Sequence, residues 1–471
     1  MNTRASGYTH GSVFRHVSGL SITSAIGLVA IFAVDLVDVF FIALLGHPEL
    51  AAAVGFAGTA LFFGAAIGIG LSIATSTVVA QAIGAANRDE AARLATHGLL
   101  FGLCLTVPLS VLSLVFAREL IALLGADGET LELAVVYFRI VVASLPILGI
   151  GMAGTSLLRA VGEARLAMWA TIIAGLVNAI LDPIFIFGFD LDLTGAAMAS
   201  VLSRCTVAGL ALYYIVSRHQ LIQHPRPTEL LGDLRQLRGI AIPSLITNLA
   251  GPLGAAYATT QMARFGTDAV AAAAVVGRMT PVAFAGLYGL SGAIGPVASQ
   301  NVGASQPRRV TQTLQSGGLF VTLYVIPVAV IMFLLKDILV DIFSLEADAA
   351  ELLRFYCTFI VISYWLYGLQ LAANPLFTAL RHPGYATISN IIRDLCLGIP
   401  LIHLGSQLFG ARGVLAGQAM GNMLAGILAF SIALWLARRV EVGKNIDLPF
   451  ACLKRRWHYY RALVPGVQHR G

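Results

Sequence analysis

The chain has 471 residues, of which 58% are hydrophobic and only 11% are charged, with a formal net charge of +6. Soluble domains carry about 25% charged residues, so a water-soluble fold of this size would lack the polar surface to cover it. Each bilayer-spanning helix needs about 20 apolar residues, and twelve would use roughly 240. The composition excludes a soluble enzyme and predicts an all-α polytopic membrane protein.

Apolar runs separated by polar breaks predict twelve transmembrane helices. These helices begin near residues 18, 50, 95, 131, 166, 195, 241, 269, 312, 354, 386 and 412. Most of the 30 lysines and arginines fall on the side that holds the N-terminus. Because basic residues stay on the cytoplasmic side of a membrane, we expect both termini in the cytoplasm.

The two halves of the chain share a sequence pattern. Gly70-Leu71-Ser72 recurs as Gly289-Leu290-Ser291, and Gln81, Gly84 and Ala85 recur as Gln300, Gly303 and Ala304, all with an offset of 219 residues. Because six spans separate the copies, the copies have the same orientation in the membrane. The repeat predicts two six-helix lobes related by a parallel pseudo-twofold axis along the membrane normal.

Composition also divides the chain into regions. We expect an N-lobe at 1–217, a polar cytoplasmic linker at 218–240, a C-lobe at 241–437 and a basic cytoplasmic tail at 438–471. The tail carries Lys454, Arg455 and Arg456 directly after a span, so we expect it to contact membrane lipids and not nucleic acid. The sequence has no P-loop, and we expect no cofactor and no obligate protein partner.

Three acids lie inside predicted spans. Asp35 and Asp38 share one face of the first span, and Asn178 and Asp182 share one face of the fifth. A charged side chain at the bilayer centre costs roughly 2.5 to 3.5 kcal/mol, so these acids must be protonated, bound to a cation or paired. Pro183 lacks a backbone N–H and frees a carbonyl beside Asp182, which adds an oxygen for a cation.

Two arginine arrangements give structural alternatives. Arg204, in the sixth span, could neutralise the acids of the first and fifth spans. Arg393 and Asp394 are adjacent and close to the predicted start of span eleven, so we expect an interfacial ion pair with a structural role. The histidines lie mostly in loops and tails without metal-ligand spacing, which argues against an intramembrane enzyme.

The order and spacing of several short motifs resemble the multidrug and toxic compound extrusion (MATE) transporters along nearly the whole chain. The motifs are Asp38-Val39-Phe40, Leu45-Gly46, Leu50-Ala51-Ala52, Gln81-Ala82-Ile83-Gly84-Ala85, Leu158-Arg159-Ala160 with Gly162, Asn178 through Pro183, Gly195-Ala196-Ala197, and Gln300 with Gly303-Ala304. This resemblance implies two six-helix lobes and outward export of amphipathic, usually cationic compounds driven by inward flow of protons or sodium ions.

Within the family, the sequence resembles the DinF-like branch. That likeness implies an ion-coupling site in the N-lobe made of Asp38, Asn178, Asp182 and Ser200, which stands where the branch has a threonine. The same four residues would hold Na⁺ if Na⁺ is the coupling ion, and no structural metal is expected. Thr23 lies where the branch has a proline early in the first helix, so a bending first helix is not implied.

These observations predict a multi-pass antiporter of the bacterial inner membrane that exports small organic cations in exchange for H⁺ or Na⁺. Asp35, Asp38 and Asp182 are the candidate substrate contacts. Asp35 departs from the family pattern, and it either attracts a cationic substrate or pairs with Arg204. The alternative is a flippase for a lipid-linked precursor, but such an anionic substrate would need more basic residues inside the membrane.

Overall fold

The computed structural model describes residues 7–45, 48–345 and 347–442. Within these ranges the protein is helical and has no β-strand. The first six spans are α1 (Val13–Leu44), α2 (Pro48–Gly84), α3 (Arg88–Val115), α5 with α6 (Gly128–Ala143 and Leu145–Ala160), α7 with η1 (Ala164–Pro183 and Ile184–Gly188) and α8 with η2 (Asp192–Tyr213 and Tyr214–Arg218). A short helix, α4 (Ala117–Leu123), follows the third span.

The second half repeats this order. Its spans are α9 (Pro227–Ala263), α10 with α11 (Thr267–Ala283 and Ala285–Gly303), α12 (Pro307–Ile342), the run from α13 (Ala347–Phe355) through η3 (Tyr356–Ile360) and η4 (Val361–Ser363) to α14 (Tyr364–Ala379), and the run from α15 (Pro383–Ile391) through η5 (Ile392–Gly398) to α16 (Ile399–Glu441). The α5–α6 and α10–α11 pairs are bent by 49° and 47°. By the 219-residue offset, α5–α6 corresponds to the interrupted run from α13 to α14, whereas α10–α11 corresponds to the continuous helix α2.

The last helical run contains two antiparallel spans. It is 59 residues long, and a straight helix of that length would measure about 88 Å, nearly three times the hydrocarbon thickness of a bilayer. At Gly410, φ is 62° and ψ is −141°, which interrupts the helix and turns the chain back. Gly405 then packs against Gly413, and Gly417 against Leu401, as in a hairpin. The described residues thus contain the twelve spans predicted from the sequence.

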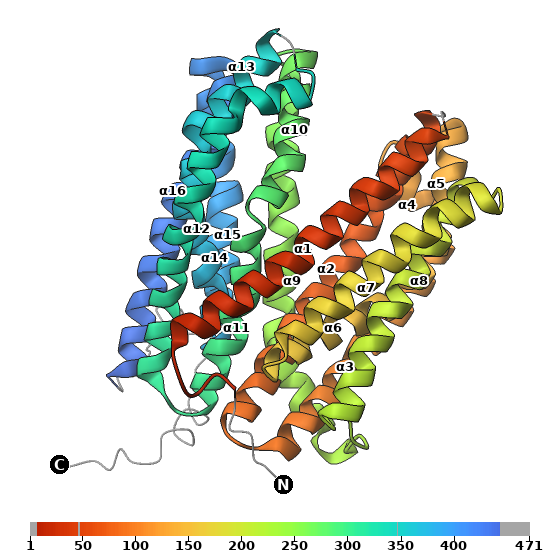
Figure 1. The fold of residues 1–471 in the computed structure, drawn as a ribbon. Coiled ribbons are helices and arrows are strands. Elements are labelled where there is room, and N and C mark those ends of the chain that lie inside the picture. The colour runs from red at the N-terminus through yellow and green to blue at the C-terminus, as the bar shows by residue number, and fades with distance from the viewer. Residues whose placement is uncertain (1–6, 46–47, 346, 443–471) are drawn as a thin grey trace.

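The spans form two lobes that diverge at one end and meet at the other, where α11 lies beside α1 and α2 (Figure 1). The repeated glycines lie in this interface. A Cβ added to Gly70 of α2 would lie 3.1 Å from the Ala241 carbonyl of α9, and one added to Gly289 of α11 would lie 2.9 Å from the Ala25 nitrogen of α1. Glycine at both positions lets helices of opposite lobes approach closely.

Two repeated glutamines cross the interface reciprocally. Gln81 Nε2 donates a hydrogen bond to the Ala379 carbonyl (2.8 Å), and Gln300 Nε2 donates one to the Ala160 carbonyl (2.7 Å). Donors and acceptors are both related by the 219-residue offset found in the sequence. The two bonds confirm the pseudo-twofold repeat, and they join the lobes through buried amide groups that would be costly to leave unpaired.

The segment before α1 also joins the lobes. The Tyr8 N–H donates to Gln300 Oε1 (3.0 Å), and the Tyr8 hydroxyl donates to the Arg159 carbonyl (3.1 Å). Burial raises the pKa of the Tyr8 hydroxyl well above its usual value, so the group remains protonated and available as a donor. This segment therefore fixes the start of α1 against both halves of the molecule.

Span seven begins earlier than its hydropathy predicts. Its helix starts at Pro227, inside the predicted linker, because a polar extension of α9 packs against α3. Asp233 accepts a hydrogen bond from Arg93 Nε (3.0 Å) and lies 2.7 Å from His97 Nδ1. Hydropathy detects only the apolar part of such a helix, so the predicted start near residue 241 is too late.

Gly84→Ala tests the close approach of α2 and α11. A Cβ at this position would overlap the Gln300 backbone, so we expect a loss of about 1–3 kcal/mol in stability and a thermal unfolding midpoint several degrees lower. Gly102→Ala is the control, because its added Cβ meets no atom within 4 Å. Equal unfolding midpoints for the two variants, measured in detergent, would contradict the assigned contact.

Candidate functional site

The N-lobe brings the first and fifth predicted spans together. Gly175 of α7 leaves room for α1, since a Cβ added there would lie 2.9 Å from Val34 Cγ2. Asp38 lies one turn further along α1, and Asp182 lies two turns further along α7. Helix packing thus places two acids that are 144 positions apart on facing helices.

The two carboxyl groups lie close enough to interact electrostatically. Asn178 Nδ2 donates to Asp182 Oδ1 at 3.2 Å, and Asp182 has no exposed surface. Asp38 Oδ1 and Asp182 Oδ2 are buried and have no hydrogen-bond partner among the described residues. A buried carboxylate oxygen without a donor is costly, so this arrangement is stabilised by a proton or a bound cation.

Ser200 joins the group through a residue that the sequence analysis missed. Tyr137 of α5 is buried, lies beside Ser200 and interacts electrostatically with Asp38 and Asp182. Ser200 makes no direct hydrogen bond to either acid within the described part of the chain. The signal available in the sequence was a tyrosine hydroxyl inside an apolar span, because a buried hydroxyl needs a partner.

Arg204 does not neutralise the acids. Its Nη1 donates to the Val141 carbonyl (2.9 Å) and to Ser144 Oγ (2.9 Å), both at the end of α5. The ion pairs of the described residues include none between Arg204 and Asp38 or Asp182. The alternative in which this arginine pairs with the two acids is therefore not supported.

Asp35 belongs to α1 by its backbone, but its side chain lies outside the described part of the structure. Whether it contacts a substrate or Arg204 stays a prediction. The oxygens that the described site offers to a cation are the two orphaned carboxylate oxygens together with the Asn178 amide oxygen. Elsewhere in the described residues, no group of three or more His, Cys, Asp or Glu side chains has an arrangement that holds a metal.

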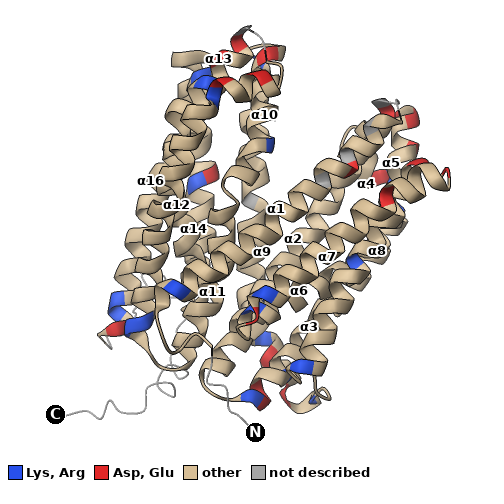
Figure 2. Ribbon diagram, in the orientation of Figure 1, with Lys and Arg blue, Asp and Glu red and all other residues tan. Residues whose placement is uncertain are grey.

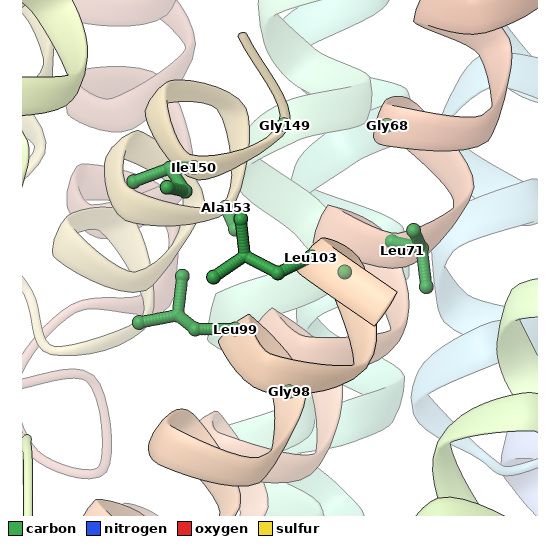
Figure 3. A pocket seen from close by; sticks show the side chains of 9 residues that line it. Gly68, Leu71, Gly98, Leu99, Leu103, Gly149, Ile150 and Ala153 are labelled. Carbon is green, nitrogen blue, oxygen red and sulfur yellow. The ribbon is translucent and has the colours of Figure 1, made fainter. Parts of the chain in front are cut away.

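A small apolar cavity lies in the same lobe between α2, α3 and α6 (Figure 3). Gly68, Gly98 and Gly149 line it together with Leu71 and Leu103, and its volume is about 10 Å³. That volume holds no more than about one water molecule, and the lining offers a water no polar side chain. The cavity is a packing gap between glycine-bearing helices and cannot accommodate an organic substrate.

The sequence profile described as MatE matches residues 24–184 and 243–404, which is more than half of the chain. The chain belongs to the MATE family. The two matched segments fall in the two halves of the structure, and the family consists of membrane transporters and not enzymes.

Curated relatives cover nearly the whole MATE chain. A protein named FAD transporter from Shewanella oneidensis is 28% identical over 433 residues, which is 91% of this chain and 96% of that protein. The multidrug export protein MepA of Staphylococcus aureus strain MSSA476 is 23% identical over 443 residues, which is 92% of this chain and 96% of MepA. These similarities support transport of small molecules out of the cell.

Solved structures have the same fold. A MATE protein in complex with MaL6 superposes with a TM-score of 0.87 at 23% identity, covering 94% of this chain and all of that one. A mutant of the MATE transporter VcmN from Vibrio cholerae gives a TM-score of 0.86 at 25% identity, covering 91% of this chain and 97% of that one. Both confirm the two-lobe architecture of a multi-pass membrane protein.

Tyr137→Phe tests the link to Ser200. Removing the phenolic hydroxyl takes a polar group away from Ser200 and alters the polarity beside the acids, so we expect ion-driven efflux to fall about threefold to tenfold, the size of one hydrogen bond. Tyr213→Phe, at an exposed ring on α8, is the matched control and should transport normally. Unchanged efflux in Tyr137→Phe would remove this residue from the site.

Proposed function

We propose that the protein exports amphipathic, cationic small organic molecules in exchange for H⁺ or Na⁺, and that Asp38 and Asp182 bind the coupling ion. The observation that supports this proposal is the buried carboxyl pair with two unpartnered oxygens. Asn178 positions the Asp182 carboxylate by donating to its Oδ1. Ser200 contributes through Tyr137 in the proposed site.

The proposed exchange follows from competition for negative charge. A proton or Na⁺ on the pair occupies its oxygens, reduces its negative charge and so weakens the attraction for an organic cation. Release of that ion restores the attraction, and binding of the organic cation makes reloading unfavourable until the cation leaves. Each ligand therefore lowers the affinity for the other by the same factor, which is the thermodynamic requirement for antiport.

The location of the acids supports an N-lobe mechanism of the DinF-like kind. The membrane-embedded parts of α9 and α14, spans seven and ten, contain no aspartate or glutamate. Asp233 and Glu229 lie in the polar extension of α9 and are engaged by Arg93. The proposed ion site thus has no acidic counterpart on these two helices of the C-lobe.

We place both termini in the cytoplasm of a bacterium, with the protein in the inner membrane. Basic residues predominate at the end where the lobes meet, and acidic residues gather where the lobes diverge (Figure 2). Under the positive-inside rule, the joined end faces the cytoplasm. The described arrangement then corresponds to a transporter whose lobes separate toward the outside. The proposed regions are the N-lobe at 1–217, the linker at 218–240, the C-lobe at 241–437 and the tail at 438–471, and α9 of the C-lobe already begins at Pro227 inside the linker.

Asp38→Asn and Asp182→Asn test the ion site in proteoliposomes loaded with a cationic dye. An amide cannot exchange a proton or carry negative charge, so either variant keeps only one carboxyl group of the pair. We therefore expect gradient-driven dye efflux to fall at least about tenfold in either variant. Asp190→Asn makes the same acid-to-amide change in the turn before α8 and should transport normally. Wild-type efflux from either test variant at normal insertion would exclude the proposed site.

The same liposomes identify the coupling ion and test the flippase alternative. An imposed pH gradient and an imposed Na⁺ gradient are applied separately, and the ion whose gradient drives efflux is the coupling ion. We expect one of the two to drive dye export and expect no movement of a labelled lipid phosphate between leaflets. Lipid flipping without dye export would favour the alternative function.

A further inference from the structure

The ion pair Arg393–Asp394 lies inside the C-lobe and not at the membrane interface. Arg393 follows the start of α15 at Pro383 by ten residues, about 15 Å along the helix, and precedes the turn at Gly410 by 17 residues, about 26 Å. The two side chains are only 11% and 12% exposed. The interfacial position expected from the sequence is therefore wrong, because the span begins earlier and is longer than its apolar core.

The pair orients a guanidinium group. Arg393 Nε donates to Asp394 Oδ1 and Arg393 Nη2 donates to Asp394 Oδ2, both at 2.8 Å. Adjacent residues on a regular α-helix do not face each other, but here they lie in the π-helical turn η5. Two of the five N–H donors of the guanidinium are used, and Nη1 has no acceptor within the part of the chain that the structure describes.

This ion pair does not tie helices together. A structural salt bridge stabilises tertiary structure by linking separate elements, whereas Arg393 and Asp394 are consecutive residues of one helix. Desolvating both charges costs several kcal/mol per ion. A ligand that binds the remaining N–H donors of the guanidinium would offset the cost of burying the pair.

Aromatic side chains surround that guanidinium. It lies over the Tyr367 ring of α14, with 5.1 Å between Arg393 Cζ and the ring centroid. Tyr288 of α11 lies close to Tyr367 and interacts electrostatically with Arg393. Both tyrosines are partly exposed, so their rings are not fully enclosed by the protein. Gly254 of α9 packs behind Asp394, since an added Cβ would lie 3.2 Å from Asp394 Cβ.

The N-lobe has different residues at the positions that the repeat relates to Arg393 and Asp394. With the 219-residue offset, Arg393 and Asp394 correspond to Ala174 and Gly175, and Gly254 corresponds to Asp35. The N-lobe therefore has no cation on its fifth span there, whereas the C-lobe has an arginine that its own neighbour holds in place. On this helix the C-lobe therefore carries a charged pair that the N-lobe lacks.

We propose that Arg393, Tyr367 and Tyr288 form a second ligand site that binds a planar aromatic molecule carrying a phosphate or carboxylate. The free edge of the Arg393 guanidinium accepts the anionic group, because a planar fork of N–H donors matches the oxygens of either group. The tyrosine rings contact the aromatic part of the ligand. This site extends the range of ligands beyond cations and is separate from the proposed ion site.

The test is equilibrium binding to the purified full-length protein in detergent, without an ion gradient. The probes are riboflavin 5′-phosphate, benzoate, uncharged riboflavin and the aromatic cation ethidium. We expect riboflavin 5′-phosphate to bind about tenfold or more tightly than riboflavin, which corresponds to a charge-assisted hydrogen bond. Competition by benzoate would show that a carboxylate also occupies the site, and its failure would assign the site to phosphate.

The double variant Arg393→Gln/Asp394→Asn removes both charges without leaving one of them unpaired. We expect it to lose the tenfold preference for the phosphate, whereas Arg278→Gln, at an exposed arginine of α10, keeps it. Tyr367→Leu should weaken riboflavin and its phosphate alike. Ethidium binding and gradient-driven ethidium efflux by the double variant show that it is folded and that the N-lobe mechanism operates.

Equal affinity of the wild-type protein for riboflavin and its phosphate, or a preference retained by the double variant, overturns the second site. Asp38→Asn separates the two proposals. It should stop ethidium efflux and leave riboflavin 5′-phosphate binding unchanged, so failure of the N-lobe proposal and failure of the C-lobe proposal give different results.

Discussion

Two acids on different helices, Asp38 and Asp182, bury their carboxyl groups against each other within one lobe. One oxygen of each acid has no hydrogen-bond partner among the described residues, and the nearby arginine Arg204 is engaged by α5. A buried pair of this kind requires a proton or a bound cation. The proposed function depends on exchanging the coupling ion for an organic cation. The remaining contacts of the site, from Asn178 and Tyr137, orient the pair without neutralising it.

Contacts between the two lobes hold one end of the transporter closed. Gln81 and Gln300 donate equivalent hydrogen bonds to backbone carbonyls of the opposite lobe, and glycines at positions 84 and 303 let α2 and α11 touch. These contacts close the end where basic residues predominate (Figure 2). A transporter that opens alternately to each side must break them, so their free energy contributes to the barrier between the two states.

Most of the fold could be predicted because apolar runs and the 219-residue repeat are encoded locally. The repeat even marked the interface residues, since Gly70, Gly289 and the two glutamines all lie there. The start of α9 could not be found by hydropathy, because contacts with α3 stabilise its polar turns. In the site, charge identified Asp38 and Asp182, whereas the role of Tyr137 depends on how α5 packs beside α8 and could not be read from spacing.

The most direct test is ion release when an organic cation binds to the purified protein. Tetraphenylphosphonium is added in weakly buffered detergent solution, and proton and Na⁺ activities are followed with an indicator and a selective electrode. The account predicts release of about one proton or one Na⁺ for each cation bound, as linkage at a shared site requires, and no release from Asp182→Asn. Tight cation binding without release of either ion, or unchanged release from Asp182→Asn, would contradict it.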